Sequence, residues 1–450
     1  MEKTNVDNAF IKQVRELLEE EGHAGLNALL ESLYPPDIAE LVDKLNARES
    51  RMIMSLIGKD KIVKVLVEMD EQVRNAFLRA YSPKEIADEF IQNMDSDDAA
   101  YVLDNLTARE SEEVISALSD IEYASSLLSL LSYDDHTAGS LMAVELVKAN
   151  INWTLAQCIE EIRRQAENVE TIYVVYVTDE HDRLVGIITL KNILLAQPTA
   201  RLADVFNKEV ISVSTSTDSD TIANIFKKYD LVVLPVVNAL GQLVGRITVD
   251  DVVEVIREEA AEDYQLMSGI TEDVVSTDKV WVLTRARLPW LLIGLVGGIA
   301  SSRFIELYED QLHIHPEMAF FIPLIAAMGG NAGVQSSAIV VQGLANNTLG
   351  TKNIIPKILK ELRVAMLNAL ICSALLFIYT MYFADSSGLS VTVCLALISV
   401  IIFASLLGTF IPLVLDRFKI DPALATGPFI TTTNDILGLV IYFTVGHLLY

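Results

Sequence analysis

The chain has 450 residues, half of them apolar, with a mean hydropathy of +0.37 and a formal net charge of −27. One hydrophobic core seldom organises so long a chain, so several domains are expected. The large excess of carboxylates argues against a nucleic-acid-binding protein, because phosphate binding needs Lys and Arg.

The charge is unevenly distributed along the chain. Only nine of the 61 acidic and nine of the 34 basic residues lie from Trp281 onward, so the preceding part carries the whole negative excess. This asymmetry predicts an acidic soluble part followed by a near-neutral apolar part. The first residues, MEKTNVDNAFIKQ, contain no apolar run, and no cleaved signal peptide is expected. Cys158, Cys372 and Cys394 are far apart in sequence, which predicts neither disulfides nor a zinc site.

Residues 1–135 have Leu and Ala at helical spacing between polar turns, which predicts an all-helical acidic domain. The stretch LNARES at 45–50 recurs as LTARES at 106–111, so stacked helix pairs in a small superhelix are expected. The stretch MDSDDAAYVL places Asp95, Asp97 and Asp98 at the start of a helix. Carboxylates at this position either cap the helix and interact with its dipole or bind a cation.

Residues 140–256 contain an internal repeat, in which RLVGIITLKNIL at 183–194 aligns with QLVGRITVDDVV at 242–253. Each copy follows an apolar strand and precedes a helix, so each is predicted to form a strand–turn–strand–helix module. This pattern resembles the cystathionine β-synthase (CBS) domain pair, with one domain at 136–199 and the other at 200–257.

In the CBS family a G-x-x-T-x-x-D run can place its Asp on a nucleotide ribose. The second copy matches that run with Gly245, Thr248 and Asp251. The first copy departs from it, because Asn192 stands at the position of the Asp, and this departure argues against ATP as a ligand.

Residues 250–263, DDVVEVIREEAAED, contain no Pro or Gly and are predicted to form one helix leading toward the first membrane span. Its carboxylates repel one another at helical spacing, with Arg257 as the only counter-charge. Either water solvates this stripe, or divalent cations bridge it to other carboxylates, and the second interpretation is favoured. The stripe and the acidic residues beside it are Asp251, Glu254, Glu258, Glu259, Glu262 and Asp263.

Five stretches are long and apolar enough to cross a bilayer, which takes roughly 20 helical residues. They cover about 288–308, 318–343, 364–384, 389–415 and 422–449. Lys and Arg flank these spans on alternate sides without exception, which predicts a cytoplasmic N-terminus and an outer C-terminus. Gly294 and Gly298 in the first span form a GxxxG pair, which favours close helix packing either within the chain or between two copies.

Asp435 in the stretch TTTNDILG carries the only formal charge between Asp421 and the last residue. An ionised carboxylate at bilayer depth costs several kcal/mol unless it faces water, a partner or an ion. The neighbouring Thr and Asn side chains carry oxygen, and Pro422, Gly427 and Pro428 permit irregular backbone before them. A buried, protonated Asp is the alternative, and a cation site in a conduction path is the favoured interpretation.

The whole chain resembles the MgtE family of bacterial magnesium channels. The resemblance follows the order of a helical domain, a CBS pair, a connecting helix and five spans. Its most specific motifs are PLIAAMGGNAGVQSS at 323–337 and DPALATGPFITTTNDILGLVIYF at 421–443. It implies domains at 1–135, 136–199, 200–257, 258–284 (a connecting plug helix) and 285–450.

The resemblance further implies a homodimer in the bacterial plasma membrane that imports Mg²⁺ and closes when intracellular Mg²⁺ is high. Asp435 matches the pore aspartate of the family, and Asn331 would line the pore. The metal-sensing carboxylates implied on the plug helix and in the cytosolic domains are Asp97, Asp98, Asp218, Asp230, Asp251, Glu254, Glu258, Glu259, Glu262 and Asp263.

A second function fits the same residues, an ion-coupled carrier of Mg²⁺ or of another divalent metal such as Co²⁺ or Mn²⁺. One buried carboxylate suits proton coupling as well as it suits a pore. An enzyme is not expected, because the sequence contains no P-loop, no G-x-S-x-G motif and no Cys/His metal cluster.

Overall fold

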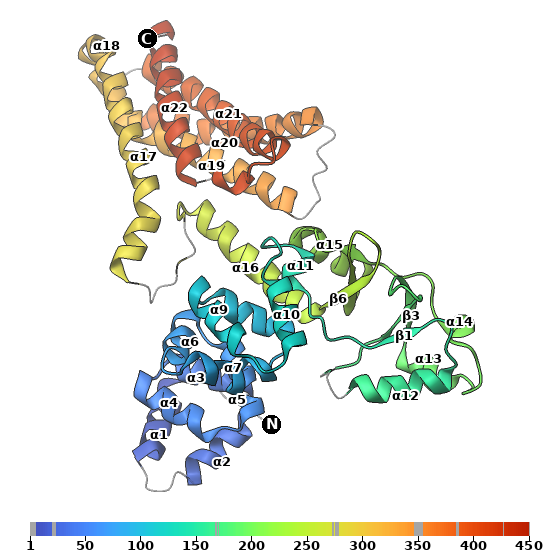
Figure 1. The fold of residues 1–450 in the computed structure, drawn as a ribbon. Helices are drawn as coiled ribbons and strands as arrows, with labels where there is room; N and C mark the ends of the chain where they lie inside the picture. Colours follow the sequence, from blue (N-terminus) through green and yellow to red (C-terminus); the bar gives the residue numbers. More distant parts are fainter. Residues whose placement is uncertain are drawn as a thin grey trace. The chain divides into compact units, whose positions relative to one another are not determined.

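The computed structural model describes residues 6–19, 24–166, 169, 171–271, 274, 279–345, 354–383, 387–425 and 427–449. The chain divides into two compact units, Met1–Ile256 and Arg257–Tyr450. Figure 1 shows a first unit of short helices and small sheets, and a second unit of long helices.

The first unit begins with short helices, as the sequence predicted. The recurring stretches LNARES and LTARES start α4 (Ala47–Leu56) and α9 (Ala108–Ala117), and both starts are capping boxes. In each box the first polar residue and a Glu three positions later satisfy each other's backbone N–H groups. The remaining helices are α1 (Asn8–Glu19), α2 (Ala24–Ser32), α3 (Pro35–Asp43), α5 (Lys59–Glu68), α6 (Glu71–Leu78), α7 (Pro83–Glu89), α8 (Ser96–Asp104), α10 (Ile121–Leu130) and α11 (Ala138–Leu141).

The CBS pair follows, and each repeat forms a three-stranded sheet with one parallel and one antiparallel pairing. Backbone bridges join the repeats, between Arg183 and Gln242 among others. The first repeat contains β1 (Lys148–Asn150), α12 (Leu155–Gln165), β2 (Val175–Thr178), β3 (Leu184–Ile188) and α13 (Leu190–Leu195). The second contains α14 (Leu202–Val205), β4 (Val213–Ser214), α15 (Ser219–Tyr229), β5 (Val233–Val237) and β6 (Leu243–Thr248).

One hydrophobic core joins the N-terminal helices to the second repeat, since Leu127 and Met142 belong to the same buried cluster as Phe226 and Ile247. The first repeat has a core of its own around Leu155 and Val177. The start of α8 is thereby positioned beside the second repeat, where the sensing carboxylates were predicted.

The connecting segment is one continuous helix, α16 (Val249–Met267), as predicted. It ends before Gly269, which adopts a left-handed conformation with φ of +78°. Glycine adopts such a φ without steric cost, so the chain turns there at the end of the helix.

The second unit contains the five predicted spans. In the described part of the chain, five helices are long and apolar enough to cross a membrane. They are α17 (Val280–Glu306), α19 (Ile322–Ala345, preceded by the 3-10 turn Pro316–Phe321), α20 (Ile354–Phe383), α21 (Ser387–Arg417) and α22 (Gly427–Leu449). The helix α20 begins ten residues before the predicted span, because a Lys-rich segment extends it beyond its apolar stretch.

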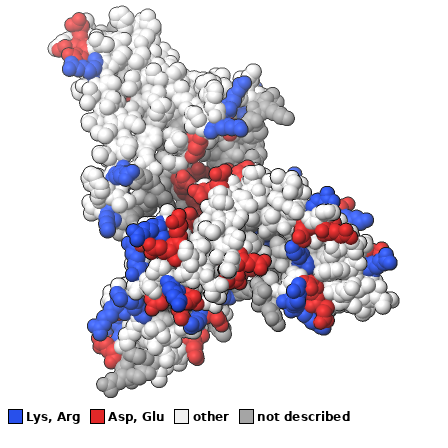
Figure 2. Space-filling view, viewed as in Figure 1, with Lys and Arg blue, Asp and Glu red and all other residues white. Residues whose placement is uncertain are grey.

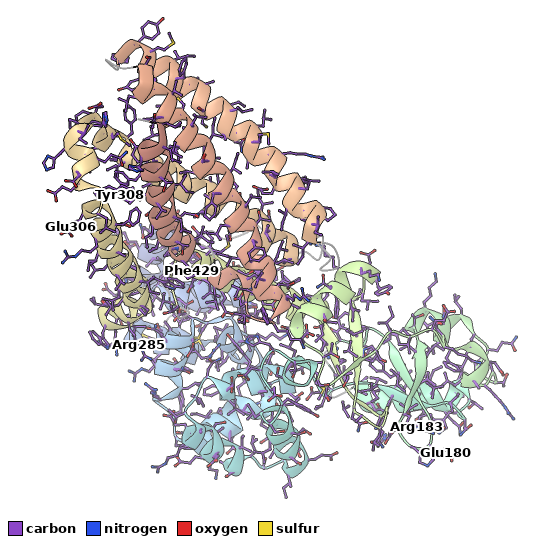
Figure 3. All side chains as sticks on the ribbon, turned by 90° about the horizontal axis from the view of Figure 1, so that it is seen from above. Glu180, Arg183, Arg285, Glu306, Tyr308 and Phe429 are labelled. Atoms are coloured by element: carbon purple, nitrogen blue, oxygen red, sulfur yellow. The ribbon has the colours of Figure 1, made fainter. Side chains whose placement is uncertain are left out.

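The helices of this unit pack around α21, the most buried of the five. The helix α19 packs against α21 and α22, α20 packs against α21, and α17 packs against α22. A short helix, α18 (Glu309–Ile314), follows α17. Tyr308, labelled in Figure 3, comes just before α18, and its ring stacks on that of Phe443 of α22 with ring centroids 4.8 Å apart.

Candidate ion pathway and cation-sensing carboxylates

Asp435 lies in the first half of α22, about 12 Å along the helix from Gly427. The predicted irregular backbone precedes it, as a 3-10 turn at Pro422–Ala425 and a left-handed Gly427 with φ of +52°. Figure 3 labels Phe429 near the start of this helix. Asp435 is half-buried among other helices of the unit, so its carboxylate is not simply exposed to lipid.

The glycines of the second span bring α19 into contact with this part of α22. A Cβ placed at Gly330 would lie 3.5 Å from Oδ1 of Asp435, and one at Gly333 would overlap the Asn434 amide. Glycine at both positions therefore lets the helices approach closely enough for Asp435 to lie against the backbone of α19. The Gly-rich stretch of the motif PLIAAMGGNAGVQSS is the surface of α19 that packs against α22.

Asn434 is the most buried polar residue beside Asp435, with 1% of its surface exposed. Neither its amide oxygen nor its amide nitrogen has a hydrogen-bond partner in the described part of the chain. A buried amide without partners costs roughly 1–3 kcal/mol, so this position is under a constraint other than stability.

Asn331 lies one residue beyond Gly330 on α19 and is exposed. It lines a cavity of about 400 Å³ between α19, α20 and α21. Consecutive residues on a helix point about 100° apart, so the two predicted pathway residues, Asn331 and Asp435, border different sides of α19.

The C-terminal end of α16 lies against the start of α22. A Cβ at Gly427 would overlap the backbone of Met267, and one at Gly269 would lie 2.6 Å from the ring of Pro428. Next to this contact, the backbone N–H of Thr271 donates to the carbonyl oxygen of Ala286 in α17 at 3.1 Å. The end of the predicted plug helix is therefore held beside the helix that carries Asp435.

In the first unit, two carboxylates predicted to sense a cation lie close together. Asp97 is in the first turn of α8 and Asp251 in the first turn of α16. Burial raises the pKa of Asp97 well above its usual range, and neighbouring negative charges raise it further. The residues that supply these charges are Asp251, Asp98 and Asp95.

The pKa of Asp251 is also raised, chiefly by burial, although two hydrogen bonds oppose the shift. Thr248 donates to Oδ2 of Asp251 through its backbone N–H at 2.8 Å and through its hydroxyl at 2.6 Å. At the corresponding place in the first repeat, the backbone N–H of Asn192 donates to Thr189 Oγ1 at 3.3 Å. Burial and like charges both disfavour ionisation at Asp97 and Asp251, which is the situation that a bound divalent cation relieves.

The sequence did not single out Arg246 and Glu145, which connect this carboxylate pair to its surroundings. The Arg246 side chain is 7% exposed, its Nε donates to the Glu145 carbonyl oxygen at 2.6 Å, and its Nη2 lies 3.9 Å from Asp95 Oδ2. The Glu145 carboxylate in turn accepts the Ser96 hydroxyl at 2.7 Å. A buried Arg within an apolar strand was the signal available in the sequence, because such a charge requires partners.

The other predicted sensing residues lie on exposed or partly exposed surfaces. Asp218 caps α15, accepting the backbone N–H of Thr221 at 2.8 Å, and Asp230 ends that helix with φ of +50°. On α16, Glu254, Glu258 and Glu262 are exposed, and Glu259 and Asp263 are partly buried.

No three His, Cys, Asp or Glu side chains of the described ranges converge closely enough to hold a metal ion. The carboxylates therefore form pairs and a stripe rather than a closed coordination shell. Figure 2 shows that acidic and basic side chains are spread over the first unit, whereas few charged side chains lie on the second.

These features define a multi-span membrane protein with a carboxylate, Asp435, within its fifth span and an acidic, CBS-containing soluble part. A family model described as a divalent cation transporter, MgtE, matches residues 322–445. Models of the MgtE intracellular N domain and of the CBS domain match 33–136, and 138–198 with 202–258, respectively.

Known proteins agree with this assignment. The magnesium transporter MgtE of Thermus thermophilus is 32% identical, and the similarity covers 97% of each chain. The magnesium transporter MgtE of Bacillus subtilis is 30% identical, over 93% of this chain and 92% of the relative. The crystal structure of the cytosolic domain of the Mg²⁺ channel MgtE in complex with ATP is 31% identical and has a TM-score of 0.51, covering 54% of this chain and 99% of that one. The chain belongs to the MgtE family.

Proposed function

We propose that this protein imports Mg²⁺ across the bacterial plasma membrane and is closed by intracellular Mg²⁺. The observation that carries the proposal is the position of Asp435, a lone carboxylate held against the glycine backbone of α19 within a five-span unit. The relatives are named magnesium transporters, which supports a transporter rather than an enzyme.

In the proposed pathway Asp435 meets an ion that keeps most of its water. Mg²⁺ dehydrates reluctantly and is commonly held by one or two carboxylates, which suits a single Asp. Thr431, whose methyl group approaches Gly330, donates its hydroxyl to the carbonyl oxygen of Gly427 at 2.9 Å. Asn331 is the second proposed pathway residue, on the adjoining side of α19.

Closure is proposed to follow from Mg²⁺ bound at the acidic residues of the soluble part and of α16. Mg²⁺ shifts the population toward the closed arrangement only if it binds that arrangement more tightly than the open one. The raised pKa of Asp97 and of Asp251 supports tighter binding where the two lie together, because the ion relieves their repulsion. The proposed sensing set is Asp97, Asp98, Asp218, Asp230, Asp251, Glu254, Glu258, Glu259, Glu262 and Asp263.

The proposed assembly is a homodimer with its N-terminus in the cytoplasm and its C-terminus outside. A Cβ at Gly294 or Gly298 of α17 would contact no atom within 4 Å, so this GxxxG face is available to a second copy. Gly297 between them packs on Thr432 within the chain. The proposed domains keep the predicted boundaries, 1–135, 136–199, 200–257, 258–284 and 285–450.

ATP binding is not part of the proposal, although one solved relative contains ATP. The Asp251 carboxylate already accepts two hydrogen bonds from Thr248 and interacts with Asp97. We therefore assign Asp251 to cation sensing rather than to a nucleotide ribose.

An ion-coupled carrier is the second candidate, because the same lone carboxylate could exchange a proton for each cation. Proteoliposomes containing the full chain separate the two functions. Mg²⁺ flux driven only by a Mg²⁺ gradient, with H⁺ and Na⁺ gradients collapsed, supports the channel. Flux that requires an H⁺ or Na⁺ gradient and loses that coupling in Asp435→Asn supports the carrier and contradicts the proposal.

A further inference from the structure

A cavity with a partly polar lining lies within the membrane unit, between α19, α20 and α21. It measures about 400 Å³, and half of its lining is aliphatic or sulfur-containing. Hydrocarbon tails satisfy no carboxylate, amide or hydroxyl group, so polar side chains at such a place indicate water, an ion or protein. The polar residues that line the cavity are Asn331, Gln335, Ser336, Glu361, Asn368 and Ser405.

Glu361 is the only carboxylate among the residues that line this cavity. It lies two turns into α20, and its Oε1 accepts the Ser336 hydroxyl of α19 at 2.6 Å. Ser336 is buried, so the bond fixes the carboxylate at the wall between the two helices. A carboxylate has about four acceptor sites, and one hydroxyl donor leaves most of them available to water or a cation.

The cavity is large enough for a hydrated divalent ion. Six waters at roughly 30 Å³ each occupy about 180 Å³, which is less than half of the available volume. Asn331, Gln335 and Asn368 are exposed, and amide oxygens are suitable acceptors for the waters of a hydrated ion.

We propose that this cavity is a second cation station of the membrane unit, in which a hydrated Mg²⁺ binds with Glu361 as its carboxylate. The proposal rests on the proposed transport of Mg²⁺ and adds a site distinct from Asp435. Among the described residues, those that line the cavity come from α19, α20 and α21, whereas Asp435 belongs to α22. In the proposed topology the station lies at the cytoplasmic end of α20.

A neighbouring lysine of α20 provides a second test of the proposal. Lys357 precedes Glu361 by one helical turn and lies on the same face of α20. Its ammonium opposes a divalent ion at Glu361, so the two residues act in opposite directions. Removing the carboxylate weakens Mg²⁺ binding, and removing the ammonium strengthens it.

Cys372 also lines the cavity and provides a native reporter, whereas Cys158 and Cys394 are buried. The experiment uses the full chain in lipid nanodiscs and a small neutral reagent, methyl methanethiosulfonate, and peptide mass spectrometry follows modification of Cys372. At a Mg²⁺ concentration about four times the dissociation constant, occupancy slows modification about fivefold. This protection is expected in the native chain and absent in Glu361→Gln, in which Ser336 still has an oxygen acceptor.

Three controls make the result specific. Without Mg²⁺ the Cys372 of Glu361→Gln reacts at the native rate, which shows that the cavity is intact. Asp435→Asn and Glu259→Gln/Glu262→Gln retain protection, which separates this site from the pathway carboxylate and from closure by the sensing residues. Lys357→Gln is protected at lower Mg²⁺ than the native chain.

The proposal of a second station is overturned if Mg²⁺ does not protect Cys372 in the native chain. It is also overturned if protection persists in Glu361→Gln, or if it disappears in Glu259→Gln/Glu262→Gln. An unchanged Mg²⁺ dependence in Lys357→Gln also contradicts it. Mg²⁺ flux measured on the same preparations reports on the proposed transport independently, so failure of the station and failure of transport are distinguishable.

Discussion

The two units carry the same chemical group in opposite settings. In the membrane unit, Asp435 lies against the glycine backbone of α19. In the first unit, Asp97 lies among Asp251, Asp98 and Asp95, whose negative charges add to the effect of burial in raising the pKa of Asp97. One carboxylate attracts a hydrated ion that can move on, whereas several together retain an ion and draw the elements that carry them together.

We propose that the number of carboxylates around a cation distinguishes the conduction site from the sensing sites. A lone carboxylate in a transmembrane unit is costly, and proteins retain such groups for an ion or proton path. A cluster of carboxylates in a soluble part is also costly, but its cost disappears when the ion arrives. In this proposal the stability of the clustered arrangement depends on the Mg²⁺ concentration.

The largest effect is expected at the lone carboxylate. Asp435→Asn keeps the shape of the side chain and removes its charge. Mg²⁺ flux into proteoliposomes should fall at least about tenfold, because each 1.4 kcal/mol of lost attraction corresponds to a factor of about ten. Thr433→Ser, a neighbouring change that keeps the hydroxyl, serves as the control. Native Mg²⁺ flux in Asp435→Asn would show that the Asp435 carboxylate is not required for conduction.

The packing that presents Asp435 is tested at Gly333. A Cβ there would overlap the Asn434 amide, so Gly333→Ala should separate α19 from α22 and cost about 1–3 kcal/mol of stability. Gly438→Ala is the matched control, because its Cβ would come no closer than 3.4 Å to Val400. Equal melting temperatures of the two purified variants would show that the close approach is not required.

The clustered carboxylates predict a pH dependence in Mg²⁺-free buffer. The pKa of Asp97 is raised in the folded chain, so the protonated form is favoured there. The associated stability is present at low pH and is lost as pH rises through the raised pKa. Lowering the pH from neutral should therefore raise the melting temperature, as Mg²⁺ does at neutral pH.

Asp97→Asn should be more stable than the native chain in Mg²⁺-free neutral buffer and should depend less on pH. The exposed Asp220, in the first turn of α15, provides the control Asp220→Asn, with an unchanged profile. An unaltered pH profile of the melting temperature in Asp97→Asn would show that repulsion among these carboxylates does not lower the stability of the folded chain.

The smallest effect is expected at Asp218, where capping and sensing can be separated. Asp218→Ala removes the acceptor for the backbone N–H of Thr221 and should cost about 1 kcal/mol, whereas Asp218→Asn retains a cap. If Asp218 also binds Mg²⁺, both variants should raise the Mg²⁺ concentration needed for closure. A shift in Asp218→Ala alone would assign the residue to capping.

Patterns that depend on local chemistry predicted most of the fold. The capping boxes at Asn46 and Thr107, the repeat at 183–194 and 242–253, and the apolar stretches each specify their element within a few residues. Asp435 was identifiable because a charge within an apolar span is conspicuous. The described part of α20 begins ten residues before the predicted span, because apolarity marks the bilayer rather than the end of a helix.

Contacts between residues far apart in the sequence could not be predicted from local patterns. Arg246 and Glu145 meet because of tertiary packing, and no local pattern brings Ser96 to them. Asn331 lines the same cavity as Glu361, whereas Gly330 beside it faces Asp435, because adjacent helical positions face different neighbours. The GxxxG pair was visible, yet Gly297 between its members makes the contact with α22.

The central claim is that Mg²⁺ itself closes the pathway through clustered carboxylates. The most direct test is single-channel recording from the full chain in planar bilayers while Mg²⁺ on the side of the soluble part is stepped through the millimolar range. The account predicts currents that decline as Mg²⁺ rises, with the decline displaced to higher Mg²⁺ in Glu259→Gln/Glu262→Gln and conductance unchanged. Currents that ignore Mg²⁺ on that side, or that decline equally in the native chain and the double variant, would contradict it.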